Sequence, residues 1–150
     1  MEPIEKVTLT NMCMIYENNK VLVQAKRDDI QGIVFPGGHV EKHESIVDSV
    51  IREMYEETGL NIYNPQLCGI KDWIQKDGSR YMVFLYKTDK FSGNLKSSEE
   101  GDVFWVEKEQ LPQLNLVWNM KELLNIFFSD VYSEFFFKIS DDNSKGILKG

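Results

Sequence analysis

The chain has 150 residues, of which 42% are hydrophobic, and this is enough for one compact domain with an apolar core. A formal net charge of −7 repels a nucleic-acid backbone and argues against a protein that binds a nucleic-acid polymer. The cysteines, Cys13 and Cys68, are too few for a disulfide framework, and neither a signal peptide nor an apolar run of ~20 residues is present, so we expect a cytoplasmic protein with free thiols and no membrane contact.

The N-terminal part of the chain has the pattern of short strands. Alternating apolar and β-favouring side chains predict strands at residues 7–15, 21–25 and 33–35. The Glu-Asn-Asn-Lys sequence at residues 17–20 predicts a hairpin turn between the first two strands. The Pro36-Gly37-Gly38 sequence ends the third strand, because proline and glycine interrupt strands, and we expect a loop after it.

The sequence pattern of residues 45–58 predicts the first helix. Ser45 is a favourable N-cap with Asp48 three residues later, and Gly59 is a favourable stop. At 100° per residue, three glutamates lie within an arc of roughly 100°, beside an apolar stripe; they are Glu53, Glu56 and Glu57. Because like charges at these spacings destabilise a helix, the arc indicates either a solvated acidic face or a site for hard cations such as Mg²⁺, which prefer oxygen ligands.

The second half of the chain adds strands at residues 67–74, 80–86, 102–106 and 135–139. Asn119 predicts the N-cap of a second helix that ends near Phe128, and Glu122 completes a capping box. Residues 1–140 are therefore expected to form one domain, and residues 141–150 a polar, frayed tail. Short strands with two separated helices predict an α+β fold in which helices pack on a mixed sheet.

The segment from Gly38 to Leu60 carries a motif with many fixed positions. A glycine is followed by a glutamate, an Arg-Glu pair, a Glu-Glu pair, a second glycine and an apolar residue. The pattern resembles the Nudix box, the signature of Nudix hydrolases, and matches it at Gly38, Glu44, Arg52, Glu53, Met54, Glu56, Glu57, Gly59 and Leu60. This resemblance implies the Nudix fold, in which a mixed sheet is sandwiched between helices as α/β/α layers.

By this resemblance, the protein hydrolyses a nucleoside diphosphate linked to a further group, with Mg²⁺ as its cofactor and Mn²⁺ as a substitute. The implied metal ligands are the Gly37 carbonyl, Glu53, Glu56, Glu57 and Glu100. Glu53 is also the implied base toward a metal-bound water, whereas Arg52 and Glu44 are expected to orient these groups. Glu100 lies in a polar loop before the 102–106 strand, where Glu99 competes for the role and an ordinary loop carboxylate is the alternative.

The chain further resembles MutT-type Nudix enzymes, which cleanse oxidised purine nucleoside triphosphates. This implies 8-oxo-dGTP as substrate, with the monophosphate and pyrophosphate as products. Asn11 lies on a largely apolar face and could read a base edge or be satisfied by the backbone. Trp118 could stack on a purine or pack in the core, and Asn119 could contact the base or only cap its helix. Further candidates for substrate contacts are Arg27, Gly38 and His39, with exposed, solvated side chains as the alternative for Arg27 and His39.

Other functions stay open on the sequence alone. A Nudix hydrolase of another nucleoside diphosphate derivative or of an RNA 5′ end would use the same box, and a non-catalytic nucleotide-sensing module would keep the same fold. The presence of Glu53, Glu56 and Glu57 favours an enzyme, and the net charge of −7 argues against RNA. We therefore expect a small-molecule nucleotide as partner. The aromatic strand at residues 135–139 is compatible with a monomer or with an edge that pairs in a homodimer.

Overall fold

The computed structural model describes residues 2–28, 31–139 and 145–150. Each predicted strand and both predicted helices are present, with ends shifted by at most two residues. In chain order the elements are β1 (Val7–Glu17), β2 (Lys20–Lys26), β3 (Ile33–Val34), β4 (Gly37–His39), α1 (Ile46–Thr58), β5 (Leu60–Ile62), β6 (Gln66–Ile74), β7 (Arg80–Thr88), β8 (Phe91–Gly93), β9 (Gly101–Glu107), the 3₁₀ helix η1 (Lys108–Gln113), α2 (Met120–Phe127), β10 (Glu134–Lys138) and β11 (Ile147–Lys149).

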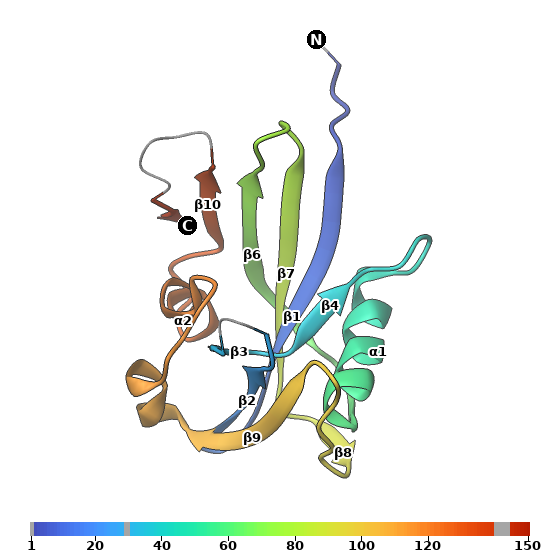
Figure 1. Cartoon of the computed structure of the whole chain (residues 1–150), viewed down its shortest axis with the longest axis vertical. Helices are drawn as coiled ribbons and strands as arrows, with labels where there is room; N and C mark the ends of the chain where they lie inside the picture. Colours follow the sequence, from blue (N-terminus) through green and yellow to red (C-terminus); the bar gives the residue numbers. More distant parts are fainter. Residues whose placement is uncertain (1, 29–30, 140–144) are drawn as a thin grey trace.

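A mixed sheet forms the centre of the molecule (Figure 1). In the described residues it has nine strands, ordered β11-β10-β6-β7-β1-β2-β3, while β4 also pairs with β1 and β9 with β2. Strand β7 runs parallel to β1 and antiparallel to β6, and β10 runs parallel to β6. The expected α+β class with a mixed sheet is therefore confirmed.

Strand β1 changes partners along its length. Thr10, Asn11 and Met12 pair with β4, whereas Tyr16 and Glu17 pair with β2 across the predicted two-residue hairpin turn. Strands β2, β3 and β9 turn away from the line of β6 and β7 (Figure 1). The short strand β4 thus lies between the two parts of the sheet, close to α1.

The apolar core lies on both faces of the sheet. Because successive side chains of a strand point to opposite faces, Met12 and Met14 pack into the cluster beneath α2, whereas Cys13 and Ile15 pack into the cluster beneath α1. Phe127 of α2 contributes to the first cluster and meets Phe35 edge-on, with ring centroids 5.0 Å apart. Helices on both faces give the α/β/α layers that the resemblance implied.

Helix α1 begins and ends where the sequence predicts. The Ser45 hydroxyl accepts a hydrogen bond from the Asp48 backbone N–H at 3.0 Å. At the other end, Gly59 adopts φ 79°, a left-handed conformation that glycine reaches without a steric penalty. Both ends of the helix that carries the acidic arc are therefore fixed by local interactions.

The predicted capping box of the second helix is wrong. Asn119 precedes α2 but makes no side-chain capping hydrogen bond. The reason lies in the backbone, because Trp118 and Asn119 have φ values of 57° and 62°. An N-cap side chain reaches its own helix from an extended conformation, so this left-handed turn directs the amide elsewhere.

Two predictions about short segments are also wrong. Residues 37–39, expected as loop, form β4, and a three-residue strand rich in glycine has no side-chain alternation to reveal it. Within the expected frayed tail, residues 141–144 lie outside the described residues, but Ile147–Lys149 forms β11, antiparallel to β10. Strand β10 is therefore covered on both sides and is not the open edge considered for pairing with a second copy.

Two further expectations concern thiols and membranes. Cys13 and Cys68 are free, as expected, and burial raises the pKa of Cys68 to about 11 and that of Cys13 even higher, so both are poor nucleophiles. In the described ranges, no helix is long and apolar enough to cross a membrane.

Truncating the buried face of α1 should destabilise the protein strongly. Met54 is fully buried, and Met54→Ala should lower the free energy of unfolding by about 2–5 kcal/mol through lost burial and a residual cavity. Urea unfolding measures this change. The neighbouring Tyr55 is 57% exposed, so Tyr55→Ala is the matched control and should change stability far less. Equal losses in the two variants would contradict this packing of α1.

Candidate functional site

Arg52 of α1 is the centre of an acidic network. Its Nε and Nη2 donate to the two carboxylate oxygens of Glu44, at 2.8 and 3.0 Å. Its Nη1 donates to Glu53 and to Glu56, each at 3.1 Å. Its Nη2 also donates to the backbone carbonyl of His39 at 2.9 Å, which ties the helix to β4. Arg52 therefore orients carboxylates rather than facing a ligand.

The charge states of this network follow from its contacts. Hydrogen bonds from Arg52 lower the pKa of Glu44 to about 2, so Glu44 stays ionised and holds the guanidinium at neutral pH. Burial raises the pKa of Glu53, and the hydrogen bond from Arg52 partly opposes that rise. The nearby Glu56 and Glu100 raise it further. Glu53 is thus a half-buried carboxylate with greater proton affinity than a solvated one.

Glycine at position 38 allows β4 to approach this carboxylate. A Cβ at Gly38 would overlap the carboxyl group of Glu53, so any larger residue would displace it. A Cβ at Gly37 would overlap the backbone carbonyl of Asn11 on β1 in the same way. The paired glycines therefore make the backbone of β4 one wall of the site.

Asn11 of β1 fixes the position of the neighbouring strand β4. Its Oδ1 accepts the backbone N–H of Gly38 at 3.2 Å, and its Nδ2 donates to the Ser49 hydroxyl at 2.9 Å. Asn11 and Ser49 are both buried, and Ser49 in turn donates to the carbonyl of Ile46 at 2.6 Å. The oxygen and the nitrogen of the Asn11 amide thus each have a partner within the protein, so the side chain positions β4, and its contact with a base stays a prediction.

A second carboxylate pair lies at the end of α1. Glu57 is 4% exposed, and its Oε2 accepts hydrogen bonds from Gln24 at 3.0 Å and from Ser98 at 2.9 Å. Burial, followed by a hydrogen bond shared with the carboxyl group of Glu100, raises the pKa of Glu57 to about 7. Two carboxylates can share such a bond only through a proton. Of the two loop candidates, Glu100 is therefore the one brought to the acidic helix.

These groups fit a divalent cation by their chemistry. A cation that displaced the proton shared by Glu57 and Glu100 would relieve the repulsion between them, and carboxylate oxygens are the ligands that hard cations prefer. As they stand, no three acidic, histidine or cysteine side chains of the described residues are grouped closely enough to enclose an ion. Glu53 and Glu56 are held by Arg52 instead.

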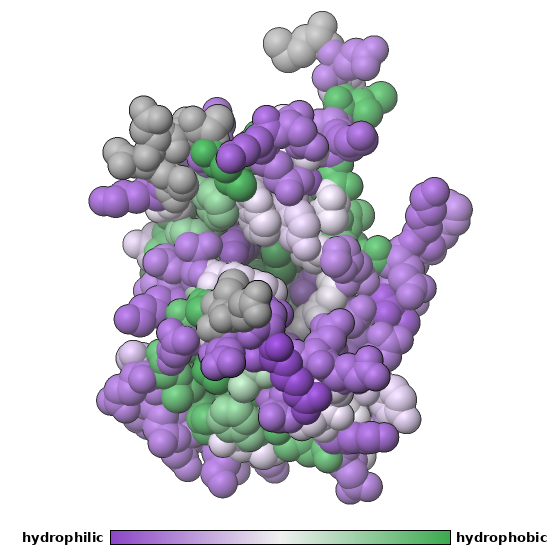
Figure 2. Space-filling view, viewed as in Figure 1, coloured by the Kyte–Doolittle hydropathy of each residue, from purple (hydrophilic) through white to green (hydrophobic). Residues whose placement is uncertain are grey.

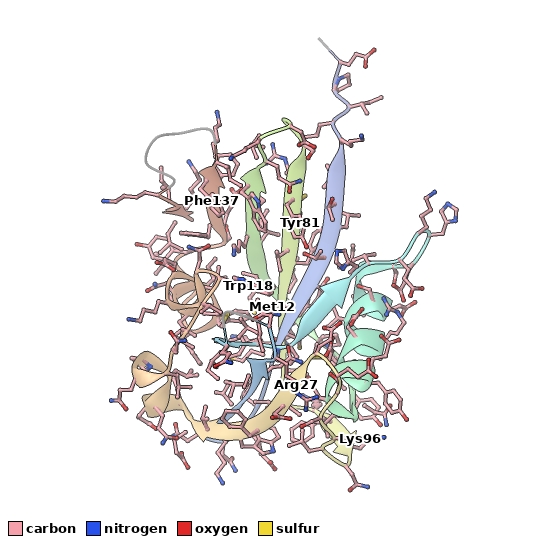
Figure 3. The ribbon with its side chains drawn as sticks, in the orientation of Figure 1. Met12, Arg27, Tyr81, Lys96, Trp118 and Phe137 are labelled. Carbon is pink, nitrogen blue, oxygen red and sulfur yellow. The ribbon has the colours of Figure 1, made fainter. Side chains whose placement is uncertain are left out.

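A cavity of about 660 Å³ extends from this acidic site along the sheet. Glu53 and Glu100 line it, and so do Trp73, Tyr81 and Phe137 from β6, β7 and β10. The three rings form a stacked row, with centroids 4.4 Å apart for Trp73–Tyr81 and 5.4 Å apart for Trp73–Phe137. Figure 3 shows Tyr81 and Phe137 above Trp118 and Met12, on β7 and β10, and β6 with Trp73 lies between these two strands. The cavity therefore has an acidic end and an aromatic end.

The surface around the cavity is mixed in polarity. Hydrophilic side chains cover most of the face shown in Figure 2, with apolar and weakly polar side chains gathered along its middle. Lys26 reaches into the cavity, and its Nζ lies 4.0 Å from the centroid of the Trp118 ring. A ligand in the cavity would thus meet carboxylates, lysines and aromatic rings in one enclosure.

The predicted substrate residues do not all meet in this cavity. Gly38, His39, Trp118 and Asn119 line it, together with Asn11. Arg27 does not. It pairs with Asp102 and lines a separate cavity that also contains Glu56 and Glu99. Because side chains alternate along β2, Lys26 rather than Arg27 faces the main cavity.

Several lining residues were missed by the sequence reasoning. They are Gln24, Lys71, Trp73 and Tyr81, and Ser98, which lines the separate cavity, was also missed as a partner of Glu57. A signal existed for Lys71 and Trp73, because alternation along the predicted strand 67–74 places them on one face, and a lysine in the middle of an apolar strand is unusual. Gln24 and Ser98 acquire their role only through contact with Glu57.

Comparison with known proteins agrees with this geometry. The chain matches the NUDIX domain family over residues 8–127. It belongs to the Nudix family. It is 40% identical over 107 residues to the Nudix hydrolase YvcI of Bacillus subtilis (strain 168), which is 68% of this chain and 67% of that relative. It is 29% identical over 126 residues to the 8-oxo-dGDP phosphatase NUDT18 of Danio rerio, but spans only 38% of that protein. The MutT protein structure from Bacillus halodurans has a TM-score of 0.78 at 29% identity and covers 94% of this chain, with 97% of that chain matched.

Membership of the Nudix family confirms the general reaction class, hydrolysis, that the sequence predicts. Nudix hydrolases act on phosphoric anhydride bonds of small-molecule nucleotide substrates and generally need a divalent metal. The expectation of a hydrolase in the Nudix fold is therefore confirmed.

The Glu57–Glu100 pair should make stability depend on pH when no metal is bound. The unfolded chain releases the Glu57 proton near the ordinary pKa of 4.5, whereas the folded protein keeps it up to about 7. The folded state binds more protons in this window, so the contribution of Glu57 to the free energy of unfolding decreases from pH 4.5 to 7 and stays low above it. Urea unfolding with a chelator, between pH 4.5 and 8, measures it.

Glu57→Gln is the control for this pH dependence. Its amide oxygen can still accept from Gln24 and Ser98 but cannot titrate, so the stability gained relative to wild type should grow from pH 4.5 to pH 8. Added Mg²⁺ at pH 8 should stabilise wild type and have less effect on the variant. A wild-type-minus-variant difference that is constant with pH would show that Glu57 does not titrate in this window.

Proposed function

We propose that the protein is a Mg²⁺-dependent nucleoside triphosphate pyrophosphohydrolase, with Mn²⁺ as a substitute metal. Its leading substrate is an oxidised purine nucleotide such as 8-oxo-dGTP, and its products are the monophosphate and pyrophosphate. The observation that supports this most is the single cavity that joins Glu53 and Glu100 to a row of aromatic rings. A nucleotide has the matching form, with an anionic chain at one end and a flat ring at the other.

The acidic end is suited to the phosphates only together with a cation. In this proposal Glu53, Glu56, Glu57 and Glu100 hold the metal with the Gly37 carbonyl, and Lys26 contacts the phosphates. When bound, the metal neutralises phosphate charge and makes a bound water easier to deprotonate. Phosphoryl transfer needs such positioning and charge stabilisation more than it needs a covalent nucleophile.

Glu53 is the proposed general base. Water adds its oxygen to a phosphorus atom, the bond from that phosphorus to the bridging oxygen breaks, and the proton of the water passes to Glu53. Arg52 bonds Oε1 of Glu53, which leaves Oε2 without an Arg52 contact to accept that proton. Arg52 and Glu44 act as positioning residues, because they orient Glu53 through hydrogen bonds.

The aromatic end is suited to a purine. Trp118 lines the cavity and is 47% exposed, so its ring is available for contact with a base, and Asn119 is free of the capping role expected for it. His39 follows Gly38 on β4, its ring lies 6.5 Å from that of Tyr81, and it lines the cavity as a candidate for a phosphate contact. Arg27 is left out of this proposal, since it is paired with Asp102 outside the main cavity.

A nucleoside diphosphate such as 8-oxo-dGDP is the second candidate substrate. The Danio rerio relative is named as an 8-oxo-dGDP phosphatase, which suggests that a diphosphate could occupy the same cavity. A kcat/KM panel of 8-oxo-dGTP, 8-oxo-dGDP, dGTP, ADP-ribose and a dinucleoside polyphosphate with Mg²⁺ separates these possibilities. We expect 8-oxo-dGTP to exceed dGTP well beyond error. A higher kcat/KM for ADP-ribose or for the dinucleoside polyphosphate would sink the substrate assignment but keep the Nudix chemistry.

Removing the proposed base should abolish most turnover without unfolding the protein. Glu53→Gln keeps the size of the side chain and an acceptor for Arg52, so circular dichroism should be unchanged, while kcat should fall by about 10²–10⁴-fold. Pyrophosphate release at saturating Mg²⁺ measures kcat. A near-normal rate in this variant would disprove the assignment.

The two loop glutamates offer a matched pair for the proposed metal site. Glu100→Gln should lower kcat/KM and raise the Mg²⁺ concentration needed for half-maximal rate, because Glu100 lines the main cavity beside Glu53. Glu99→Gln should leave both values close to wild type, because Glu99 lines the separate cavity. A larger effect from Glu99→Gln would exchange the two assignments.

A further inference from the structure

Lys71 is a buried ammonium group that attracts Glu122 at longer range but has no carboxylate of the described residues within salt-bridge distance. It lies in the middle of β6, between Val83 of β7 and Phe135 of β10, and is only 6% exposed. Its Nζ donates to the backbone carbonyl of Trp118 at 2.8 Å and lies 4.9 Å from the centroid of the Trp73 ring. Within residues 2–28, 31–139 and 145–150 it forms no salt bridge, because every such pair involves other residues.

Such a group has unused hydrogen-bonding capacity. An ammonium carries three N–H donors, and the Trp118 carbonyl takes only one of them. Burial lowers the pKa of Lys71 to about 8, as expected for a charge whose lost hydration is only partly replaced. Since Lys71 lines the main cavity, a ligand in that cavity can supply the missing acceptor.

The position of Lys71 indicates which part of a nucleotide it meets. Lys26 lies on β2 opposite Gly101, next to Glu100 at the acidic end, and its Nζ also stands over the Trp118 ring. Lys71 lies instead beside the rings of the aromatic end, on the same face of the sheet as Trp73. Both lysines border Trp118, but Lys71 is the one beside the row of Trp73, Tyr81 and Phe137, and this position favours an acceptor on the base over one on the phosphates.

The left-handed turn before α2 contributes to this arrangement. Trp118 and Asn119 have φ values of 57° and 62°, and this turn carries the Trp118 carbonyl that Lys71 binds. The same segment places Trp118 and Asn119 along the cavity. Lys71 thus joins β6 to the loop whose side chains border the proposed base site.

We propose that Lys71 is a specificity residue that donates a hydrogen bond to an exocyclic carbonyl oxygen of the bound base. The enzyme would then favour nucleotides with oxo-bearing purines, such as hypoxanthine, guanine and their oxidised forms. It would discriminate against adenine, whose amino group at the corresponding position donates and cannot accept. This inference rests on the proposed function, which puts a nucleotide in the cavity.

The test compares two substrates that differ at that position and in the hydrogen on the neighbouring ring nitrogen N1. Hypoxanthine in dITP has an oxo group where adenine in dATP has an amino group. A hydrogen bond to a charged group corresponds to a preference of about 10- to 150-fold, so wild-type kcat/KM for dITP should exceed that for dATP by this factor. Lys71→Met, which keeps length and apolar contacts but removes the donors, should bring the ratio close to one.

Lys26→Met is the matched control. It removes a lysine from the acidic end of the same cavity, so it should lower kcat/KM for both nucleotides and leave their ratio as in wild type. Lys71→Met should fold, because it removes a buried charge that forms no salt bridge in the described residues and has only a longer-range attraction to Glu122, and its thermal midpoint should equal or exceed that of wild type. This measurement separates lost recognition from lost structure.

Binding provides a second reading that does not need turnover. Equilibrium titration with dIMP and dAMP should show the same preference in wild type and its loss in Lys71→Met. An equal loss for both bases in Lys71→Met would assign Lys71 to the phosphates or to structure and overturn the inference, as would a wild-type ratio near one. If no nucleotide is hydrolysed, the proposed function fails, and binding alone then tests Lys71. Its role is overturned if the dIMP/dAMP affinity ratio is near one in wild type, or if Lys71→Met leaves that ratio unchanged.

Discussion

One guanidinium organises the acidic face of α1. Without a cation nearby, Glu44, Glu53 and Glu56 would repel one another, and like charges on adjacent turns weaken a helix. Arg52 bonds each of them and also the His39 carbonyl, so the same side chain that neutralises the helix attaches it to β4. The ionised Glu44 holds the guanidinium by two bonds, which leaves the orientation of Glu53 determined by a rigid pair rather than by solvent.

The pairing of the strands positions the rest of the cavity relative to Arg52 and its carboxylates. Strand β4 is held on one side by Asn11 and on the other by Arg52, and Gly38 lets its backbone lie against Glu53. Because β1 pairs with β4 on one side and with β7 on the other, Gly38 beside Glu53 and Tyr81 of the aromatic row flank the same strand. The distance between Gly38 at the acidic end and Tyr81 at the aromatic end is therefore set by the sheet, whereas Glu100 and Trp118 reach the cavity from loops.

The sequence predicts the acidic end far better than the aromatic end, for a physical reason. The residues of the Nudix box lie on one helix and its flanks, so local periodicity places Glu53, Glu56 and Glu57 correctly on one side of α1. The surroundings of Lys71 depend instead on strand pairings between distant segments, such as Phe135 with Lys71, and on a left-handed turn before α2 that overrides the expected cap. Alternation on β2 likewise decides that Lys26 faces the cavity, and its sense depends on the tertiary fold.

Each end of the cavity has charged groups whose interactions are incomplete, and the charges at the two ends are opposite. At one end burial and the neighbouring Glu100 raise the pKa of Glu57, and at the other the buried Lys71 ammonium has one neutral acceptor. Each arrangement destabilises the protein alone, and each would be relieved by the part of a metal–nucleotide complex that the proposals put there. The cation would neutralise the surplus of negative charge. The oxo group of the base would accept a hydrogen bond from the unused N–H donors of Lys71. A cavity with these complementary deficits selects a ligand that satisfies both together, which a free phosphate or a free base does not.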